Sequence, residues 1–181
     1  ITVEIEHVSI PALKRLQAEG VNVYPQPELL EIVQDKGLQK EFYRDKGIPT
    51  AEFRLIESKA DLKDHADFLP FAQKLRKGGY DGKGVQIIRT VADFEKAFDA
   101  PSVLEKFVPF EKELAVIAAR NTKGETTEFP AVELEFNPEA NLVELLFAPA
   151  DISSEIEQKA RDIAKHTIDA FGFVGMFAVE L

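Results

Sequence analysis

One stretch of the sequence reads Lys74-Leu75-Arg76-Lys77-Gly78-Gly79-Tyr80-Asp81-Gly82-Lys83-Gly84. It contains four cations, one anion and four glycines, and apolar segments that predict strands lie on both sides of it. Glycines allow successive backbone N–H groups to turn toward one ligand, and the surrounding cations favour an anion such as a phosphate. The stretch therefore predicts a phosphate-binding loop between two strands, and the alternative is a plain hairpin tip with solvated charges.

Neither of two common phosphate-binding patterns fits this loop. The P-loop pattern GxxxxGK[ST] opens a helix and the dinucleotide pattern GxGxxG lies between a strand and a helix, whereas this loop joins two strands. Lys74 favours ligand binding, because it lies in an otherwise apolar strand and an unpaired buried ammonium is costly. Its side chain either extends to solvent at the strand end or meets an anion that the loop holds.

The sequence around the loop predicts a small α+β module followed by an antiparallel sheet. Apolar alternation predicts strands at 51–56, 70–75, 85–89, 103–107, 113–120, 128–136 and 142–148, and helices at 60–68 and 92–98. Ser154 and Glu157 form a capping-box pattern that opens a further helix, and Gly172 ends it. Residues 173–181 then read as a buried strand.

The N-terminal part of the chain reads differently. Strand 1–5, helix 11–19 and strand 21–24 form a unit typical of parallel sheets. A helical pattern from 28 to 46 is interrupted near Asp35. Because the chain begins and stops inside strand-like runs, we expect a piece of a longer polypeptide.

Composition excludes several classes of function. The chain has 181 residues, a net charge of −10 and no cysteine. The acidic balance argues against nucleic-acid binding, and the lack of cysteine excludes disulfides, a thiolate nucleophile and Cys-ligated zinc. The sequence contains no apolar run of about 18 residues, so it predicts no helix that spans a membrane. We therefore expect a cytoplasmic protein that binds neither nucleic acid nor membranes.

Two further groups carry chemistry. Between Glu105 and Glu113, an apolar connection with backbone polar groups can hold a flat heterocycle while a carboxylate reaches a ribose hydroxyl. Glu180 lies in an apolar strand, where a carboxylate is seldom buried unpaired, and predicts one metal ligand. For these carboxylates, the alternative is simple exposure to solvent. His7, just after the first strand, lies where α/β proteins bind ligands.

The order of these motifs is similar to that of a known superfamily. The glycine stretch is preceded by Asp35-Lys36-x-x-Gln39-Lys40 and Gly47-Ile48-Pro49, and followed by Leu104-Glu105-x-Phe107-Val108-x-x-x-x-Glu113-Leu114. This arrangement closely resembles the ATP-grasp superfamily. Thr2 to Val8 and Gly175 to Leu181 match too, so that the resemblance covers essentially the whole chain. Within the superfamily the chain looks like the purine-biosynthesis ligases that carboxylate 5-aminoimidazole ribonucleotide.

The resemblance implies a mixed α/β and α+β fold: a small α+β lid and a larger antiparallel-sheet domain, preceded by the end of a parallel α/β domain. Residues 1–26 would end the N-terminal ribonucleotide-binding domain and 27–48 would be linking helices. Residues 49–104 would be the lid subdomain. Residues 105–181 would be a central subdomain that is incomplete at its C-terminus.

The resemblance also implies a reaction and its site. ATP phosphorylates bicarbonate to carboxyphosphate, and 5-aminoimidazole ribonucleotide is then carboxylated, giving 5-(carboxyamino)imidazole ribonucleotide, ADP and phosphate. The implied ATP-binding residues are Lys36, Lys74, Gly79, Tyr80, Asp81, Gly82, Lys83, Gly84, Val85, Glu105, Lys106, Phe107, Val108, Glu113 and Phe136. The implied ribonucleotide contacts are Glu4, Glu6, His7, Tyr80 and Asp81. Glu180 would bind magnesium, and a second metal carboxylate and the bicarbonate site are expected beyond residue 181. A homodimer is also implied.

Two positions depart from the pattern of many members of these ligases. Val85 stands where many carry Gln, and Phe136 stands where many carry His, which puts one nucleotide contact in doubt. Two alternatives therefore remain. One is another ATP-grasp ligase, of the glycinamide ribonucleotide transformylase or biotin carboxylase type, and the other is a nucleotide-binding module without catalysis.

Overall fold

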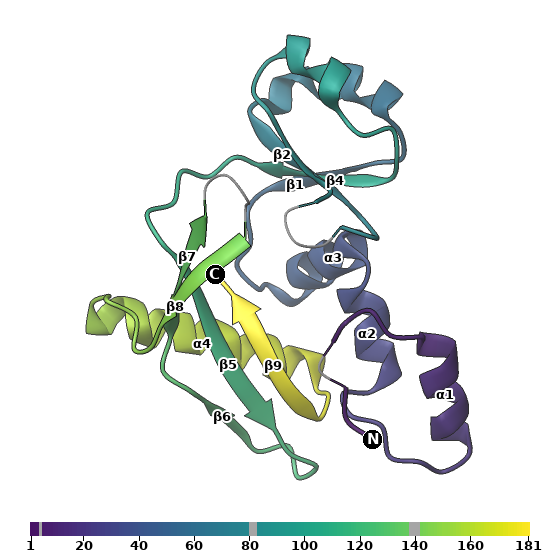
Figure 1. Ribbon diagram of the computed structural model, residues 1–181, viewed down its shortest axis with the longest axis vertical. Coiled ribbons are helices and arrows are strands. Elements are labelled where there is room, and N and C mark those ends of the chain that lie inside the picture. The colour runs from purple at the N-terminus through teal and green to yellow at the C-terminus, as the bar shows by residue number, and fades with distance from the viewer. Residues whose placement is uncertain (4, 80–82, 138–141) are drawn as a thin grey trace. The chain divides into compact units, whose positions relative to one another are not determined.

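The computed structural model describes residues 1–3, 5–79, 83–137 and 142–181. The chain forms two compact units. Residues 34–109 form one of them, which we call the hairpin unit, and residues 1–33 together with 110–181 form the other, which we call the sheet unit. The elements of each unit are labelled in Figure 1.

The hairpin unit contains a four-stranded antiparallel sheet in the order β1-β4-β2-β3. The strands are β1 (Phe53–Ile56), β2 (Phe71–Leu75), β3 (Val85–Ile88) and β4 (Ser102–Lys106). Each lies within or one residue from its predicted range, because the alternation of apolar residues marks the face that the core covers. The strand predictions for this unit are confirmed.

Two short helices cover one face of this sheet (Figure 1). They are η1 (Lys59–Phe68) and η2 (Val91–Lys96), so helices form close to the ranges expected, 60–68 and 92–98, and both are 3-10 helices. Asp61 and Asp93 each accept hydrogen bonds from backbone N–H groups just before their helix, which closes tight turns at both starts. Phe71, Ile88 and Leu104 are fully buried in the core that these helices cover.

The opposite face of the same sheet carries Lys74 and Glu105. The register pairs Ala72 with Glu105 and Lys74 with Val103, and side chains alternate between faces along a strand. These four residues therefore share the face that lies away from the core.

Helix α3 (Lys36–Lys46) begins where the sequence pattern is interrupted. Asp35 is its N-cap, and the Asp35 carboxylate accepts hydrogen bonds from the N–H groups of Gly37 and Leu38 at 2.9 and 3.2 Å. Gly47 ends the helix in the left-handed region, with φ of +65°. The expected interruption at Asp35 and the stop at Gly47 are both confirmed.

The sheet unit contains a five-stranded antiparallel sheet. β6 (Thr126–Glu128) and β7 (Val132–Asn137) pair with one edge of β5 (Glu113–Arg120), and β9 (Gly175–Glu180) pairs with the other. β8 (Leu142–Phe147) pairs with β7. The strand expected at 128–136 is wrong as a single element, because Pro130 has no N–H and the Ala131 N–H donates to the Glu157 carboxylate.

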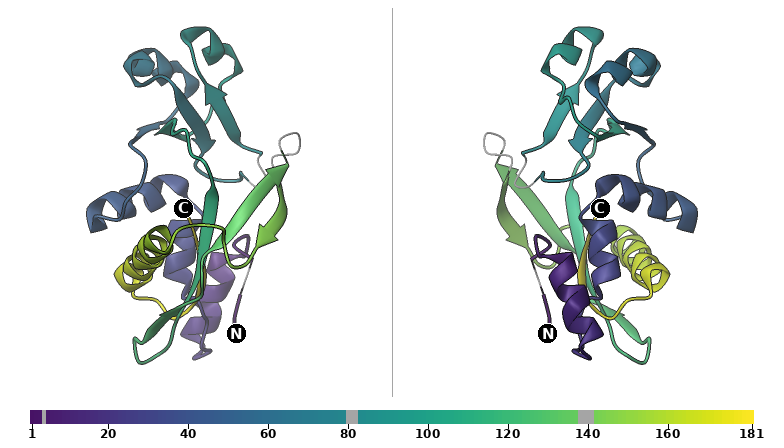
Figure 2. Two further views of the ribbon diagram at one scale, coloured as in Figure 1. Left: turned by 90° about the vertical axis from the view of Figure 1, so that its left-hand side faces the viewer. Right: turned by 90° about the vertical axis from the view of Figure 1, so that its right-hand side faces the viewer.

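Helix α4 (Ser154–Phe171) lies along one face of this sheet (Figure 2). Its N-cap is Ser153, whose hydroxyl accepts a hydrogen bond from the Ile156 N–H, so the expected capping box of Ser154 with Glu157 is wrong. Ala160 and Ala164 pack against Val116 and Val179 of the sheet. The other face of β9 is exposed, which corrects the expectation that residues 173–181 form a buried strand.

The sheet unit also contains α1 (Ile10–Ala18) and α2 (Pro27–Val33). The two strands expected around α1 are reduced to one parallel bridge between Thr2 and Tyr24. Leu13, Val23 and Leu30 form a small core of their own. In the part of the chain that the structure describes, no helix is long and apolar enough to span a membrane.

Candidate functional site

The glycine stretch connects β2 to β3, as the sequence predicts. The Leu75 N–H donates to the Gly84 carbonyl at 2.9 Å, which closes the base of the loop. Gly84 has φ of +88°, and a Cβ there would lie 3.0 Å from the Cα of Gly79. Glycine is therefore required where the two arms of the loop approach each other. Tyr80, Asp81 and Gly82 lie outside the described residues, so their roles stay predictions.

Three charged side chains meet on the face of the hairpin sheet away from the core. The Lys74 Nζ lies 2.8 Å from Glu105 Oε2, and the Lys40 Nζ lies 2.9 Å from Glu105 Oε1. The side chains of Lys40 and Glu105 are only 12% and 16% exposed. Lys74 thus meets a carboxylate of its own chain, an arrangement that neither of the two alternatives for this residue foresaw.

Burial and the neighbouring charges shift the pKa values of Glu105 and Lys40 in this group. Burial acts to raise the pKa of Glu105, but the ammonium groups of Lys74 and Lys40 together hold that pKa below its ordinary value. Burial lowers the pKa of Lys40, and the positive charges of Lys74 and Lys36 add to the effect. Lys40 and Lys74 therefore share one carboxylate, and the charge of Lys36 acts on Lys40, so that this part of the hairpin unit carries a surplus of positive charge, which favours an anion.

Lys40 is a residue that the sequence interpretation missed as a member of the site. Its Nζ donates to the Thr50 hydroxyl at 2.5 Å in addition to its contact with Glu105. One signal points to it, because Lys40 follows Lys36 by four positions in α3 and such residues lie on one face of a helix.

Lys106, the residue after Glu105, lies on the opposite face of the sheet from Glu105. Lys106 points to the core side, where its Nζ donates to the carbonyls of Phe68 and Leu69, each at 3.0 Å. The Phe107 ring lies 5.0 Å from the Arg89 guanidinium, and Val108 is 50% exposed. Since the ammonium of Lys106 is already engaged, only its backbone groups can serve the predicted heterocycle site.

Three predicted site residues share one face of the sheet unit. Glu180 pairs with Ala115, and Glu113 lies two positions before Ala115 in β5. Leu134 pairs with Glu113, and Phe136 lies two positions after Leu134 in β7. By the alternation of strand side chains, these three lie on the face opposite α4.

Glu180 offers an exposed carboxylate on that face. Among the residues that the structure describes, no three His, Asp or Glu side chains converge on a metal position. A single carboxylate fits magnesium only where phosphate oxygens or further carboxylates supply the other ligands. Glu6 and His7 are exposed in the sheet unit, and Glu4 is outside the described residues.

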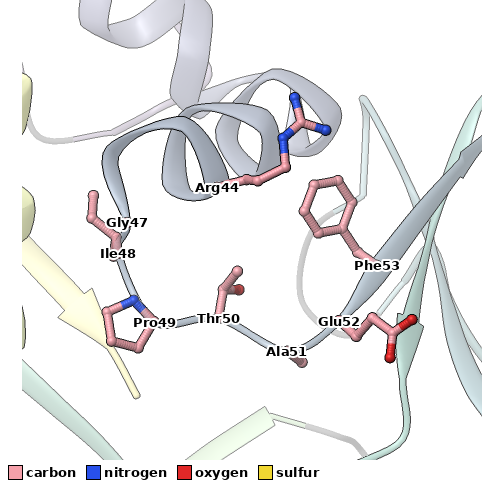
Figure 3. Close-up of a pocket in the computed structure, with 8 residues that line it drawn as sticks. All are labelled: Arg44, Gly47, Ile48, Pro49, Thr50, Ala51, Glu52 and Phe53. Atoms are coloured by element: carbon pink, nitrogen blue, oxygen red, sulfur yellow. The ribbon is translucent and has the colours of Figure 1, made fainter.

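A pocket of about 440 Å³ follows the connection between α3 and β1 (Figure 3). It is lined by Arg44, Gly47, Ile48, Pro49, Thr50, Ala51, Glu52 and Phe53. The Arg44 guanidinium lies 5.9 Å from the centre of the Phe53 ring. Thr50 joins this pocket to the charged group, because its hydroxyl accepts the hydrogen bond from Lys40.

Several known proteins are similar to this chain in sequence and fold. An N5-carboxyaminoimidazole ribonucleotide synthase from Synechocystis sp. is 36% identical over 184 residues, covering 99% of this chain and 46% of the relative. The crystal structure of N5-carboxyaminoimidazole ribonucleotide synthetase from Thermotoga maritima is 40% identical, with a TM-score of 0.84, and covers 99% of this chain and 46% of that one.

A third similar protein was solved with ligands. The N5-carboxyaminoimidazole synthase of Aspergillus clavatus, in complex with ADP and 5-aminoimidazole ribonucleotide, is 33% identical with a TM-score of 0.87. The match covers 99% of this chain and 48% of that one, so the chain spans about half the length of these relatives. The sequence also matches the ATP-grasp domain family over residues 41–181, which is well over half of the chain. The chain therefore belongs to the ATP-grasp family.

Proposed function

We propose that this chain is the nucleotide-binding part of a ligase that carboxylates 5-aminoimidazole ribonucleotide. ATP and bicarbonate would give carboxyphosphate, and the products would be 5-(carboxyamino)imidazole ribonucleotide, ADP and phosphate, in de novo purine biosynthesis. The observation that carries the proposal is the pair of lysines, Lys40 and Lys74, around Glu105, beside a glycine loop, in a chain whose relatives are named for this reaction.

The residues divide the work as follows. Lys36 and Lys74 bind the phosphates, residues 79–84 cover them, and Val85 also belongs to the ATP site. Glu105, Phe107, Val108 and the backbone of Lys106 line the adenine site, and Glu113 holds the ribose. Such a site acts by positioning and by neutralising the transferring phosphoryl group, and it needs no protein nucleophile.

Magnesium would be bound through Glu180 together with phosphate oxygens. Bound there, it would neutralise charge on the transferring phosphoryl group. Phe136, on the same sheet face as Glu180, supplies only an apolar contact to the nucleotide. Exclusion of water from the site would protect the carboxyphosphate from hydrolysis.

The remaining parts of the proposal concern the rest of the protein. Glu6 and His7, with Glu4, Tyr80 and Asp81, would contact the ribonucleotide. Residues 1–26 would end the ribonucleotide-binding domain, 27–48 would link it, 49–104 would be the lid and 105–181 would belong to the central subdomain. The whole protein would be a cytoplasmic homodimer.

The test is ADP release by the whole protein that contains this chain, with each component omitted in turn. We expect release to require ATP, magnesium, bicarbonate and 5-aminoimidazole ribonucleotide. If the rate of ADP release does not depend on 5-aminoimidazole ribonucleotide, the proposed substrate is wrong. Activity with glycinamide ribonucleotide and formate, or with biotin, would assign the chain to another ATP-grasp ligase. Nucleotide binding with no turnover would identify a module without catalysis.

A variant pair tests the nucleotide site itself. Lys74→Met should weaken ATP binding by about tenfold, the effect of one lost charge-assisted hydrogen bond. Lys14→Met serves as the control, since it removes a lysine that is paired with Glu31 on the surface of the sheet unit. Equal ATP affinity in the two variants would remove Lys74 from the phosphate site.

A further inference from the structure

A second charged pair lies beside the glycine loop, and none of the proposed contacts uses it. Arg76 forms two parallel hydrogen bonds with Asp35, from Nε to Oδ1 at 2.9 Å and from Nη2 to Oδ2 at 3.0 Å. Asp35 is 4% exposed and is also the N-cap of α3. One carboxylate therefore serves both the start of a helix and a guanidinium that extends from the end of β2.

Backbone contacts reinforce this pair. The Lys36 N–H donates to the Arg76 carbonyl at 2.9 Å, and the Arg76 N–H donates to the Pro101 carbonyl at 3.1 Å. The guanidinium lies so close over α3 that a Cβ on Gly37 would be 2.5 Å from Arg76 Nε. The backbones of Lys36 and Arg76 are thus held against each other by main-chain and side-chain bonds together.

Arg76 lies between Lys74 and the glycine loop in the sequence, so its contacts affect the position of both. Arg76 follows Lys74 by two residues and precedes Gly78, the first glycine of the loop, by two. Lys36 is the first residue of α3. Fixing Arg76 against Asp35 therefore fixes Lys36, Lys74 and the start of the loop relative to one another.

The two parallel hydrogen bonds between Arg76 and Asp35 suit this pair to fixing the position of the backbone. A guanidinium and a carboxylate joined by two parallel bonds are restricted in direction as well as in distance, whereas an ammonium is a point donor. Two other charged groups lie farther away: Lys77 Nζ is 3.7 Å from Asp35 and Glu57 is 3.7 Å from Arg76. Neither can replace the two-bond contact.

We propose that Arg76 is a positioning residue that, through Asp35, holds Lys36 and the start of the glycine loop in their binding geometry before the nucleotide arrives. The inference rests on the proposed function, because it assigns Lys36 to the phosphates. It predicts that loss of the two-bond contact weakens nucleotide binding far more than it slows the chemical step.

The kinetic test compares Arg76→Lys and Asp35→Asn with Asp67→Asn in the whole protein that contains this chain. Asparagine caps helices about as well as aspartate, so Asp35→Asn removes the ion pair and keeps the cap. Asp67 forms the same kind of two-bond pair with Arg54, at 2.8 Å for both bonds, elsewhere in the hairpin unit. We expect the KM for ATP to rise about tenfold in the first two variants, with kcat within about twofold, and no change in the control.

A second measurement does not depend on activity. The rate at which a lysine-specific protease cuts after Lys77 reports how firmly the start of the loop is held, and Asp35→Asn and Asp67→Asn leave every lysine in place. We expect severalfold faster cutting at Lys77 in Asp35→Asn, with cutting after Lys123 of the sheet unit unchanged. ATP affinity is measured on the same samples by equilibrium binding.

The outcomes separate this inference from the proposed function. Unchanged ATP affinity with unchanged cutting at Lys77 would overturn the role of Arg76, as would equal effects in Asp67→Asn. A loss of stability with no selective change at Lys77 would reduce the pair to an ordinary structural contact and would also overturn it. If ADP release proves independent of 5-aminoimidazole ribonucleotide while Asp35→Asn still weakens ATP binding and speeds cutting after Lys77, the positioning role of Arg76 holds and only the proposed substrate is wrong.

Discussion

Lys74 and Glu105 are diagonal neighbours on adjacent strands of the hairpin unit, and their charged atoms lie 2.8 Å apart. The position two residues along from a directly paired residue is within reach of long side chains, so the register of β2 and β4 dictates this contact. The sequence identifies both residues as candidates, but it does not predict the register of β2 against β4, which depends on the tertiary fold. Lys40 then reaches the same carboxylate from α3.

Replacing the shared carboxylate should destabilise the hairpin unit. Glu105→Gln leaves the ammonium groups of Lys40 and Lys74 without their counter-charge, and we expect a loss of about 2 kcal/mol in the free energy of unfolding. The loss is smaller than for a fully buried pair because the Lys74 side chain is 33% exposed. Chemical denaturation measures it.

The control for this variant is Asp45→Asn, which breaks the surface pair of Arg44 and Asp45 with side chains 59% and 64% exposed. We expect its free energy of unfolding to match the wild type within about 0.5 kcal/mol. A Glu105→Gln protein as stable as this control would show that the cluster contributes nothing to folding.

Gly37→Ala should destabilise the protein, although alanine is the better helix former. The new Cβ would lie 2.5 Å from Arg76 Nε, and the guanidinium cannot move aside without losing its contacts to Asp35. We expect a cost of about 1–2 kcal/mol, as for other overpacked sites.

The same substitution in an Arg76→Ala background provides the control. There the clash is absent, and Gly37→Ala should be neutral or stabilising because alanine has the higher helix propensity. The two effects are compared by denaturation as a double-mutant cycle. Equal costs in both backgrounds would mean that Arg76 is not the group that the Cβ meets.

The strands of the hairpin unit were predictable because of their apolar alternation, and the start of α3 was predictable because Asp35 interrupts the helical pattern. Two kinds of feature were not. Residues 59–68 and 91–96 have helical composition, but both form 3-10 helices, and the first contains non-helical backbone at His65. The break at Pro130 was visible as a proline, yet its consequence depends on Glu157, far along the chain, which receives the Ala131 N–H.

The candidate site divides in the same way. The glycine loop and Lys74 follow from residue type and local spacing, and the structure places them together. The pairing of Lys40, Glu105 and Lys74 is a long-range contact between elements, which no local pattern contains. Likewise, the division of Glu105 and Lys106 between two faces follows from strand alternation only once the core face is known.

Asp93 should titrate far below an ordinary aspartate. The Thr90 N–H, the Lys96 ammonium and the Arg89 N–H lower its pKa to about 2. Because the pKa is lower in the folded state, this carboxylate stabilises the fold above the unfolded pKa of 3.8, and the stabilisation is lost as pH falls toward about 2. Carboxyl chemical shifts followed by NMR should show this midpoint, and Lys96→Met should move it upward. A midpoint near 3.8 in the wild type would contradict the bonding seen here.

The start of α4 offers a test between two adjacent serines. The sequence pattern points to Ser154 as the N-cap, but the Ser153 hydroxyl is the one that accepts the hydrogen bond from the Ile156 N–H. Ser153→Ala should therefore cost about 1 kcal/mol in the free energy of unfolding, since a helix N–H loses its partner. Ser154→Ala, at the first helical position, should change it by less than about 0.5 kcal/mol, because alanine is a good helix former. Denaturation of both variants decides the matter, and the reverse order of stabilities would place the cap at Ser154.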